Sequence, residues 1–186
     1  MRGGRIGPRT TAEHTTDHRF SQAIGGIEYD PTHGPQIGKR AVGSMLLIER
    51  ALVRRLEQRA EAAWPREICG LLVGQKGEER RLVCEAVPLA NCADSSDAFS
   101  ATPLDVLEVE QRARRGGLVV VGVFHSHPGG SASPSSADLK SAIDGYGRHH
   151  SWLILPIRLG RATDPSAWTL DRTGRRFAPE HLIDTD

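Results

Sequence analysis

The sequence predicts an α/β domain in which a curved, mixed β-sheet is flanked by helices. Apolar runs of strand length alternate along the chain with stretches whose apolar residues recur at helical spacing. Two of the strands follow each other across a polar turn, which favours a hairpin. Others are separated by helices, which favours crossover connections. A sheet that combines both connections contains antiparallel and parallel neighbours.

Composition indicates an ordinary globular protein. The 186 residues are 38% hydrophobic and 25% charged, with a formal net charge of +1. This balance gives no electrostatic case for nucleic acid or an anionic membrane as a partner. No apolar run approaches the roughly 20 residues of a membrane span, and the start lacks the apolar region of a secretory signal. Three cysteines without a C-x-x-C motif favour the reducing cytoplasm.

Residues 1–44 differ from the rest of the chain. They hold eight of the 20 glycines, contain few large apolar residues and show no lasting hydrophobic period. We interpret them as a largely disordered N-terminal extension. His14 and His18 have helical spacing there, but without an apolar face they are expected to be solvated. The folded domain is expected to span residues 45–186, and Met45 is a hypothetical native start.

The first part of this domain is expected to be a helix followed by a hairpin. Apolar residues recur at intervals of three or four over residues 47–63, and Trp64-Pro65 ends that helix because proline disfavours a helical residue before it. Strands are predicted over residues 67–74 and 81–89, joined by a polar turn. Residues 91–97 then form a loop, and residues 98–101 a short strand.

A well-signalled helix comes next. Thr102 is a favourable N-cap, Pro103 suits the first helical position and Asp105 completes a Thr-x-x-Asp capping box. Gly116 is expected to stop the helix. The remaining elements are a helix that opens at Ser135 and ends at Gly145, a surface turn at His149-His150, strands over residues 152–157 and 166–171, and a frayed helix over residues 179–183.

The central strand carries the first chemical signal. Residues 118–123 form an apolar run with four valines, and the strand is expected to continue to its end at Pro128. Side chains two apart on a strand point to the same face, so His125 and His127 project side by side. The linker 129–134 then leads to Asp138, near the start of the next helix.

Two imidazoles and one carboxylate suit zinc. Catalytic zinc sites use three protein ligands and leave the fourth tetrahedral position to water, and His125, His127 and Asp138 supply the three. Such a site also needs an acid/base, and the candidate is Glu67, a carboxylate at the start of an apolar strand. Taken alone, Ser135-x-x-Asp138 would indicate only a capping box at the start of a helix, and Glu67 would be an ordinary loop carboxylate. The combination favours a metal site.

Together, Glu67, His125-x-His127-Pro128 and Ser135-x-x-Asp138 resemble the JAMM motif of the MPN+ zinc metalloprotease family, and their flanking residues resemble its prokaryotic JAB-domain branch. The resemblance covers roughly residues 45–170. It implies the MPN (cytidine-deaminase-like) fold and one Zn²⁺ per chain. It also implies that Glu67 is the general acid/base, that His125, His127 and Asp138 bind the metal, and that Ser135 helps to hold the oxyanion.

The resemblance further implies a metallopeptidase or isopeptidase that cleaves after the C-terminal glycine of a ubiquitin-like or sulfur-carrier protein, typically ending in diglycine. The loop 91–97 would border the groove for the carrier's tail, although a solvated connection is an equal expectation for it. A non-catalytic MPN interaction scaffold and a zinc hydrolase of a small amide or peptide stay open as alternatives. All five motif residues are present, which argues against the scaffold. The sequence specifies neither the carrier nor the oligomeric state.

Cys69 has two interpretations. It lies two positions after Glu67 and so shares its face of the strand. As a fourth, thiolate ligand it would close the metal site and make it structural. As a small packed core residue it would have no direct role, and we favour this second interpretation.

Overall fold

The computed structural model describes residues 44–96, 98–145 and 149–185, which form three helices and eight strands. The predicted N-terminal extension, with His14 and His18, lies outside these residues except for Ser44. The strands are β1 (Met45–Glu49), β2 (Cys69–Lys76), β3 (Arg80–Leu89), β4 (Val119–His127), β5 (Ser151–Arg158), β6 (Arg161–Ala162), β7 (Ser166–Leu170) and β8 (Phe177–Thr185). The helices are α1 (Arg50–Ala63), α2 (Pro103–Arg115) and α3 (Ser136–Asp144).

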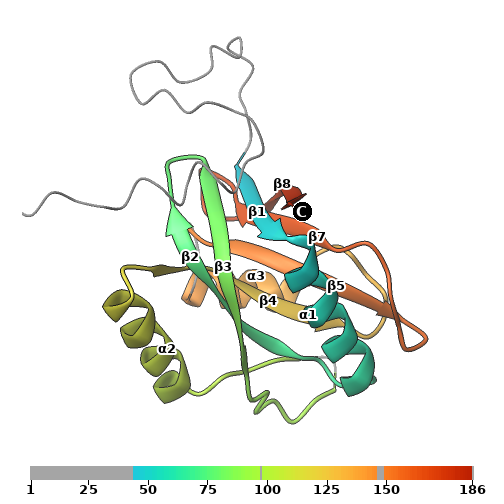
Figure 1. Cartoon of the computed structure of the whole chain (residues 1–186). Helices are drawn as coiled ribbons and strands as arrows, with labels where there is room; N and C mark the ends of the chain where they lie inside the picture. The colour runs from blue at the N-terminus through green and yellow to red at the C-terminus, as the bar shows by residue number, and fades with distance from the viewer. Residues whose placement is uncertain (1–43, 97, 146–148, 186) are drawn as a thin grey trace, which may run out of the picture. The chain divides into compact units, whose positions relative to one another are not determined.

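The sheet is mixed and closes on itself. Its strand order is β4-β2-β3-β1-β8-β7-β5-β6, and β4 also pairs with β5, so the strands form a closed barrel to which β6 is attached through β5 (Figure 1). The pairs β1–β3, β1–β8 and β4–β5 are parallel, and the others are antiparallel. The predicted α/β class with a mixed sheet is confirmed. The closure goes beyond the curved sheet that the sequence predicted.

The chain between Met45 and Arg50 corrects the first predicted element. The helix was expected to begin at residue 47, but Met45–Glu49 is strand β1 and α1 starts at Arg50. Leu46 and Ile48 are completely buried because β1 lies between β3 and β8. Ile48 is also four residues before Leu52 of α1, so the helical period extends into the strand and hides the boundary.

Two further predictions were wrong. Residues 98–101 form no strand, because side-chain hydrogen bonds from Asn91 hold this segment in an irregular path. Residues 179–183, expected as a frayed helix, belong to β8, whose backbone pairs with β1 and β7. An isolated helix of five residues would be unstable, so the segment instead forms backbone hydrogen bonds with β1 and β7. His149 is exposed as predicted, whereas His150 is half-buried, and burial lowers its pKa to about 4.

Two hydrophobic clusters lie on opposite faces of β4. Phe124 belongs to the cluster that packs against α1. Val123 belongs to the cluster that packs against α2 and α3. Because side chains alternate along a strand, His125 and His127 continue the Val123 face. Helix α3, on that face, starts only a short linker after β4 (Figure 1). Within the described ranges no helix is both long and apolar enough to cross a membrane.

Candidate metal centre

The three predicted metal ligands meet at the end of β4. His125 Nε2 lies 3.2 Å from Asp138 Oδ1, and His127 Nε2 lies 3.3 Å from Asp138 Oδ2. The two Nε2 atoms are 2.9 Å apart. All three residues are buried, and they are the group of His, Cys, Asp and Glu side chains in the described parts of the chain whose ligand atoms converge in this way.

The spacing of these atoms fits zinc. Ligand atoms about 2.0–2.1 Å from a tetrahedral zinc ion lie about 3.3 Å from one another. The two Nε2 atoms here are 2.9 Å apart, and each lies near a different oxygen of the Asp138 carboxylate, His125 Nε2 at 3.2 Å from Oδ1 and His127 Nε2 at 3.3 Å from Oδ2. Two nitrogens and one carboxylate also form the donor set of open catalytic zinc sites, in which a fourth position is left for water or substrate.

A hydrogen bond orients the ring of His127 so that its Nε2 faces the other two ligands. Its Nδ1 lies 3.0 Å from the carbonyl oxygen of Ser131, which can only accept, so Nδ1 carries a proton in both charge states of the ring, and when the ring is neutral Nε2 presents its lone pair. The ring of His125 stacks on Phe99 with centroids 4.5 Å apart. Its Nδ1 is buried without a hydrogen-bond partner among the described residues.

Electrostatics keep Asp138 ionised. Burial alone would raise the pKa of its carboxyl, but hydrogen bonds from His125 and His127 and from the Ser135 backbone outweigh it, so this pKa lies below its ordinary value. Burial lowers the pKa of His125. Burial also opposes protonation of His127, but its contacts with Asp138 prevail and raise that pKa. A buried carboxylate that accepts from every neighbour is suited to bind a cation.

The capping box predicted at Ser135 forms, and Asp138 belongs to it as well as to the metal cluster. Ser135 Oγ accepts from the Asp138 N–H at 3.1 Å, and the Ser135 N–H donates to Asp138 Oδ2 at 2.6 Å. Asp138 can therefore cap the helix and also belong to the metal cluster. Neither bond uses the hydroxyl proton of Ser135, which is exposed at the cleft and able to donate.

Glu67 lines the same cleft. It lies just before β2, is 7% exposed, and lines a cleft of about 270 Å³ together with His127, Ser135 and Asp138. The neighbouring backbone is joined to β4 by Ser126: Ile68 N–H donates to Ser126 Oγ at 2.9 Å, and Ser126 N–H donates to the Ile68 carbonyl at 3.0 Å. His125 lies buried behind the cleft.

The profile described as "Prokaryotic homologs of the JAB domain" matches residues 49–171. The chain belongs to this family. It is 34% identical over 101 residues to the "Probable TtuB-protein conjugate cleaving protease" of Thermus thermophilus, a match that covers 54% of this chain and 65% of that protein. It is 29% identical over 100 residues to the "CysO-cysteine peptidase" of Mycobacterium tuberculosis, covering 54% and 67%. It is 28% identical over 109 residues to the "Desampylase" of Pyrococcus furiosus, covering 59% and 70%.

The match therefore spans about two thirds of the length of these curated relatives. Two solution structures resemble the fold. A protein from Desulfitobacterium hafniense superposes with a TM-score of 0.63 at 30% identity, covering 75% of this chain and 92% of that one. A protein from Salinibacter ruber gives 0.57 at 25% identity, covering 75% and 91%.

In this JAB-domain chain Cys69 is a packed core residue. It is 2% exposed and stands directly opposite His125 in the β2–β4 ladder. Its sulfur is not among the converging ligand atoms. Burial, and secondarily the charge of Glu67, raises the pKa of its thiol to about 11, which disfavours the thiolate. The three-ligand arrangement is thus the one the geometry supports.

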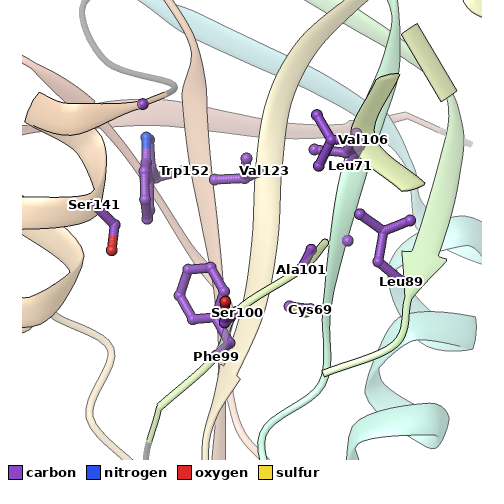
Figure 2. Close-up of a pocket in the computed structure, with 12 residues that line it drawn as sticks. Cys69, Leu71, Leu89, Phe99, Ser100, Ala101, Val106, Val123, Ser141 and Trp152 are labelled. Carbon is purple, nitrogen blue, oxygen red and sulfur yellow. The ribbon is translucent and has the colours of Figure 1, made fainter. Parts of the chain in front are cut away.

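A second, apolar cavity of about 220 Å³ adjoins the cleft. Figure 2 shows Trp152 and Phe99 along one side of it, with Cys69, Leu71 and Leu89 on the other. Phe99 and Ser141 line both hollows. The sequence did not point to Phe99 or Ser126, because a lone aromatic in a loop and a serine within a buried strand carry no local signal. Only the alternation along β4 sets Ser126 apart from the histidines.

Proposed function

We propose that this chain is a zinc-dependent JAMM metallopeptidase that cleaves a peptide or isopeptide bond after the C-terminal glycine of a ubiquitin-like or sulfur-carrier protein. The observation that carries the proposal is the convergence of His125, His127 and Asp138 at a cleft shared with Glu67 and Ser135. The closed barrel would then be the MPN fold, with residues 45–186 as its catalytic domain. Three free cysteines accord with a cytoplasmic enzyme.

Each residue has a defined task in this proposal. His125, His127 and Asp138 would hold one zinc ion, which when bound supplies a Lewis acid for the scissile carbonyl and an acidified water. Glu67 takes a proton from the attacking water and returns it to the leaving amine, so that the amine departs neutral. Ser135 donates its hydroxyl proton as a hydrogen bond to the carbonyl oxygen as negative charge develops there.

The names of the relatives support a carrier protein on the acyl side of the scissile bond. One is named for cleaving TtuB-protein conjugates and another as a CysO-cysteine peptidase. Both bonds require a cleft open to a folded partner, and the exposed Ser135 lies at the surface of this one. The substrate of this chain would accordingly be a carrier with a diglycine end, joined to an amino acid or a lysine side chain.

Trial cleavage tests this proposal. The zinc-loaded protein is incubated with a diglycine-ended carrier extended by one amino acid, with the same carrier joined to a lysine side chain, and with a short glycyl-glycyl peptide amide. We expect mass spectrometry to show release of the amino acid from the first substrate and of the lysine side chain from the second. The short peptide should be cleaved slowly. Cleavage of the short peptide alone would assign a small-amide hydrolase. Turnover of none of the three, with zinc bound, would favour a scaffold.

A further inference from the structure

One side chain ties the loop after β3 to the backbone of Glu67. The Asn91 Nδ2 group donates to the Glu67 carbonyl at 3.0 Å and to the Ala98 carbonyl at 2.9 Å. Its Oδ1 accepts from the Ala93 N–H at 3.0 Å and from the Ser100 N–H at 3.1 Å. A carboxamide has two N–H donors and one oxygen with two lone pairs, so every bonding position of Asn91 is used.

These partners demand asparagine. Carbonyl oxygens only accept and backbone N–H groups only donate, which fixes the orientation of the amide. Aspartate would keep the two bonds to N–H groups but would place an oxygen against the carbonyls of Glu67 and Ala98. Alanine would lose all four bonds.

The loop held by Asn91 borders the candidate site on two sides. The Glu67 N–H donates to the Ser96 carbonyl at 3.2 Å, so both backbone groups of Glu67 bond to this loop. Phe99 lies between Ala98 and Ser100, two of the four bonding partners of Asn91, and stacks on the ring of His125. Figure 2 shows the Phe99–Ala101 segment running past Cys69 at the start of β2.

Glu67 depends on this loop because of its place in the chain. Strand β2 begins at Cys69, so Glu67 precedes the ladder. The nearest ladder-like bonds are those between Ile68 and Ser126. Rotation of the backbone at Glu67 would move its carboxylate, and in enzymes a misplacement of about 1 Å can lower the rate about a hundredfold.

We propose that Asn91 is a positioning residue of the reaction. It fixes the backbone of Glu67 and the position of Phe99, so that the Glu67 carboxylate faces the metal cluster. This inference rests on the proposed function. The four hydrogen bonds of Asn91 among the described residues go to Glu67, Ala93, Ala98 and Ser100 and not to the metal cluster, and so it acts on the site through Glu67 and Phe99.

The test compares Asn91→Ala and Asn91→Asp with Asp94→Asn, a substitution at an exposed position of the same loop. Four quantities are measured: kcat and KM on the carrier substrate, zinc content, and amide hydrogen exchange along the chain. In both Asn91 variants we expect kcat to fall about tenfold to a hundredfold, with KM and zinc content unchanged. Exchange of the Glu67 amide should be at least about tenfold faster in both variants, and exchange of the Ser100 amide at least about tenfold faster in Asn91→Ala, because Asn91→Asp keeps the bond from the Ser100 N–H. Asp94→Asn should match the wild type.

Several results would overturn the proposal. They are an unchanged kcat, a loss of zinc equal to the loss of activity, and unchanged exchange at Glu67. Unfolding of both variants would also overturn it, because it would assign Asn91 to the stability of the fold. If the wild type cleaves no substrate, the proposed function fails, while the exchange measurement still decides whether Asn91 holds Glu67.

Discussion

Glu67→Gln is expected to lower kcat about 10²- to 10⁴-fold, the range that a positioned general acid/base contributes. Glutamine has the shape of glutamate but its carboxamide does not take up a proton at neutral pH, so the proton of the attacking water has no acceptor. Zinc content should stay at the wild-type level, because Glu67 is not among the three residues whose ligand atoms converge. Steady-state kinetics with metal analysis of the same preparations measure both quantities.

Glu78→Gln is the matched control for this result. Glu78 is exposed in the turn between β2 and β3 and does not line the cleft. Its substitution replaces a carboxylate by a carboxamide, as Glu67→Gln does. It should leave kcat and zinc content unchanged. Full activity of Glu67→Gln would refute its role as the base, and loss of zinc in that variant would make Glu67 a ligand instead.

The largest expected effect on stability comes from Arg81→Met. Arg81 Nη1 lies 2.6 Å from Glu180 Oε1, with the two side chains 8% and 0% exposed. Arg81 also donates to Ser44 and to the His149 carbonyl, so it joins β3 to the chain around β1 and β8. Methionine keeps the apolar stem but leaves the buried Glu180 carboxylate without its charged partner, with the Ser44 hydroxyl still able to donate to it. The free energy of unfolding should fall by about 3–5 kcal/mol, measured by urea denaturation.

The exposed pair Arg112–Glu85 provides the comparison. Its side chains are 51% and 49% exposed, so solvent screens the interaction. Arg112→Met should change the free energy of unfolding by less than about 1 kcal/mol. Adding Glu180→Gln to Arg81→Met should recover part of the loss, since it removes the buried charge. Equal small effects in Arg81→Met and Arg112→Met would show that the buried pair is not required.

Local patterns predicted the elements whose partners are close in sequence. The valine run of β4, the N-cap at Thr102 and the capping box at Ser135 gave correct elements, because each depends on residues within one turn or one strand, although at Thr102 only the bond from the Asp105 N–H to the Thr102 side chain forms. Closure of the sheet depends on β1, β8 and the parallel β4–β5 pairing. These contacts join distant segments, and the period of a single strand does not specify its neighbours.

The same distinction applies to the candidate site. His125 and His127 were brought together by strand geometry, and Asp138 by the short linker to the next helix. Glu67 was a candidate because it is a carboxylate at the start of an apolar strand, but its role as the acid/base came from the resemblance, because it lies 58 residues before His125. Ser126, Phe99 and Asn91, which contact Ile68, His125 and Glu67, were not individually singled out for the site, since one serine, one phenylalanine and one asparagine are common residues whose partners appear only in the fold.

The metal centre is tested most directly by the zinc content of the purified protein at neutral pH without chelator. Wild type is compared with His127→Ala and with His149→Ala, an exposed histidine outside the metal cluster. We predict about one zinc per chain in the wild type and in His149→Ala, and its loss in His127→Ala, since a three-ligand site that loses a ligand binds the ion weakly. No zinc in the wild type, or equal zinc in all three proteins, would contradict the assignment of His125, His127 and Asp138 as a zinc site.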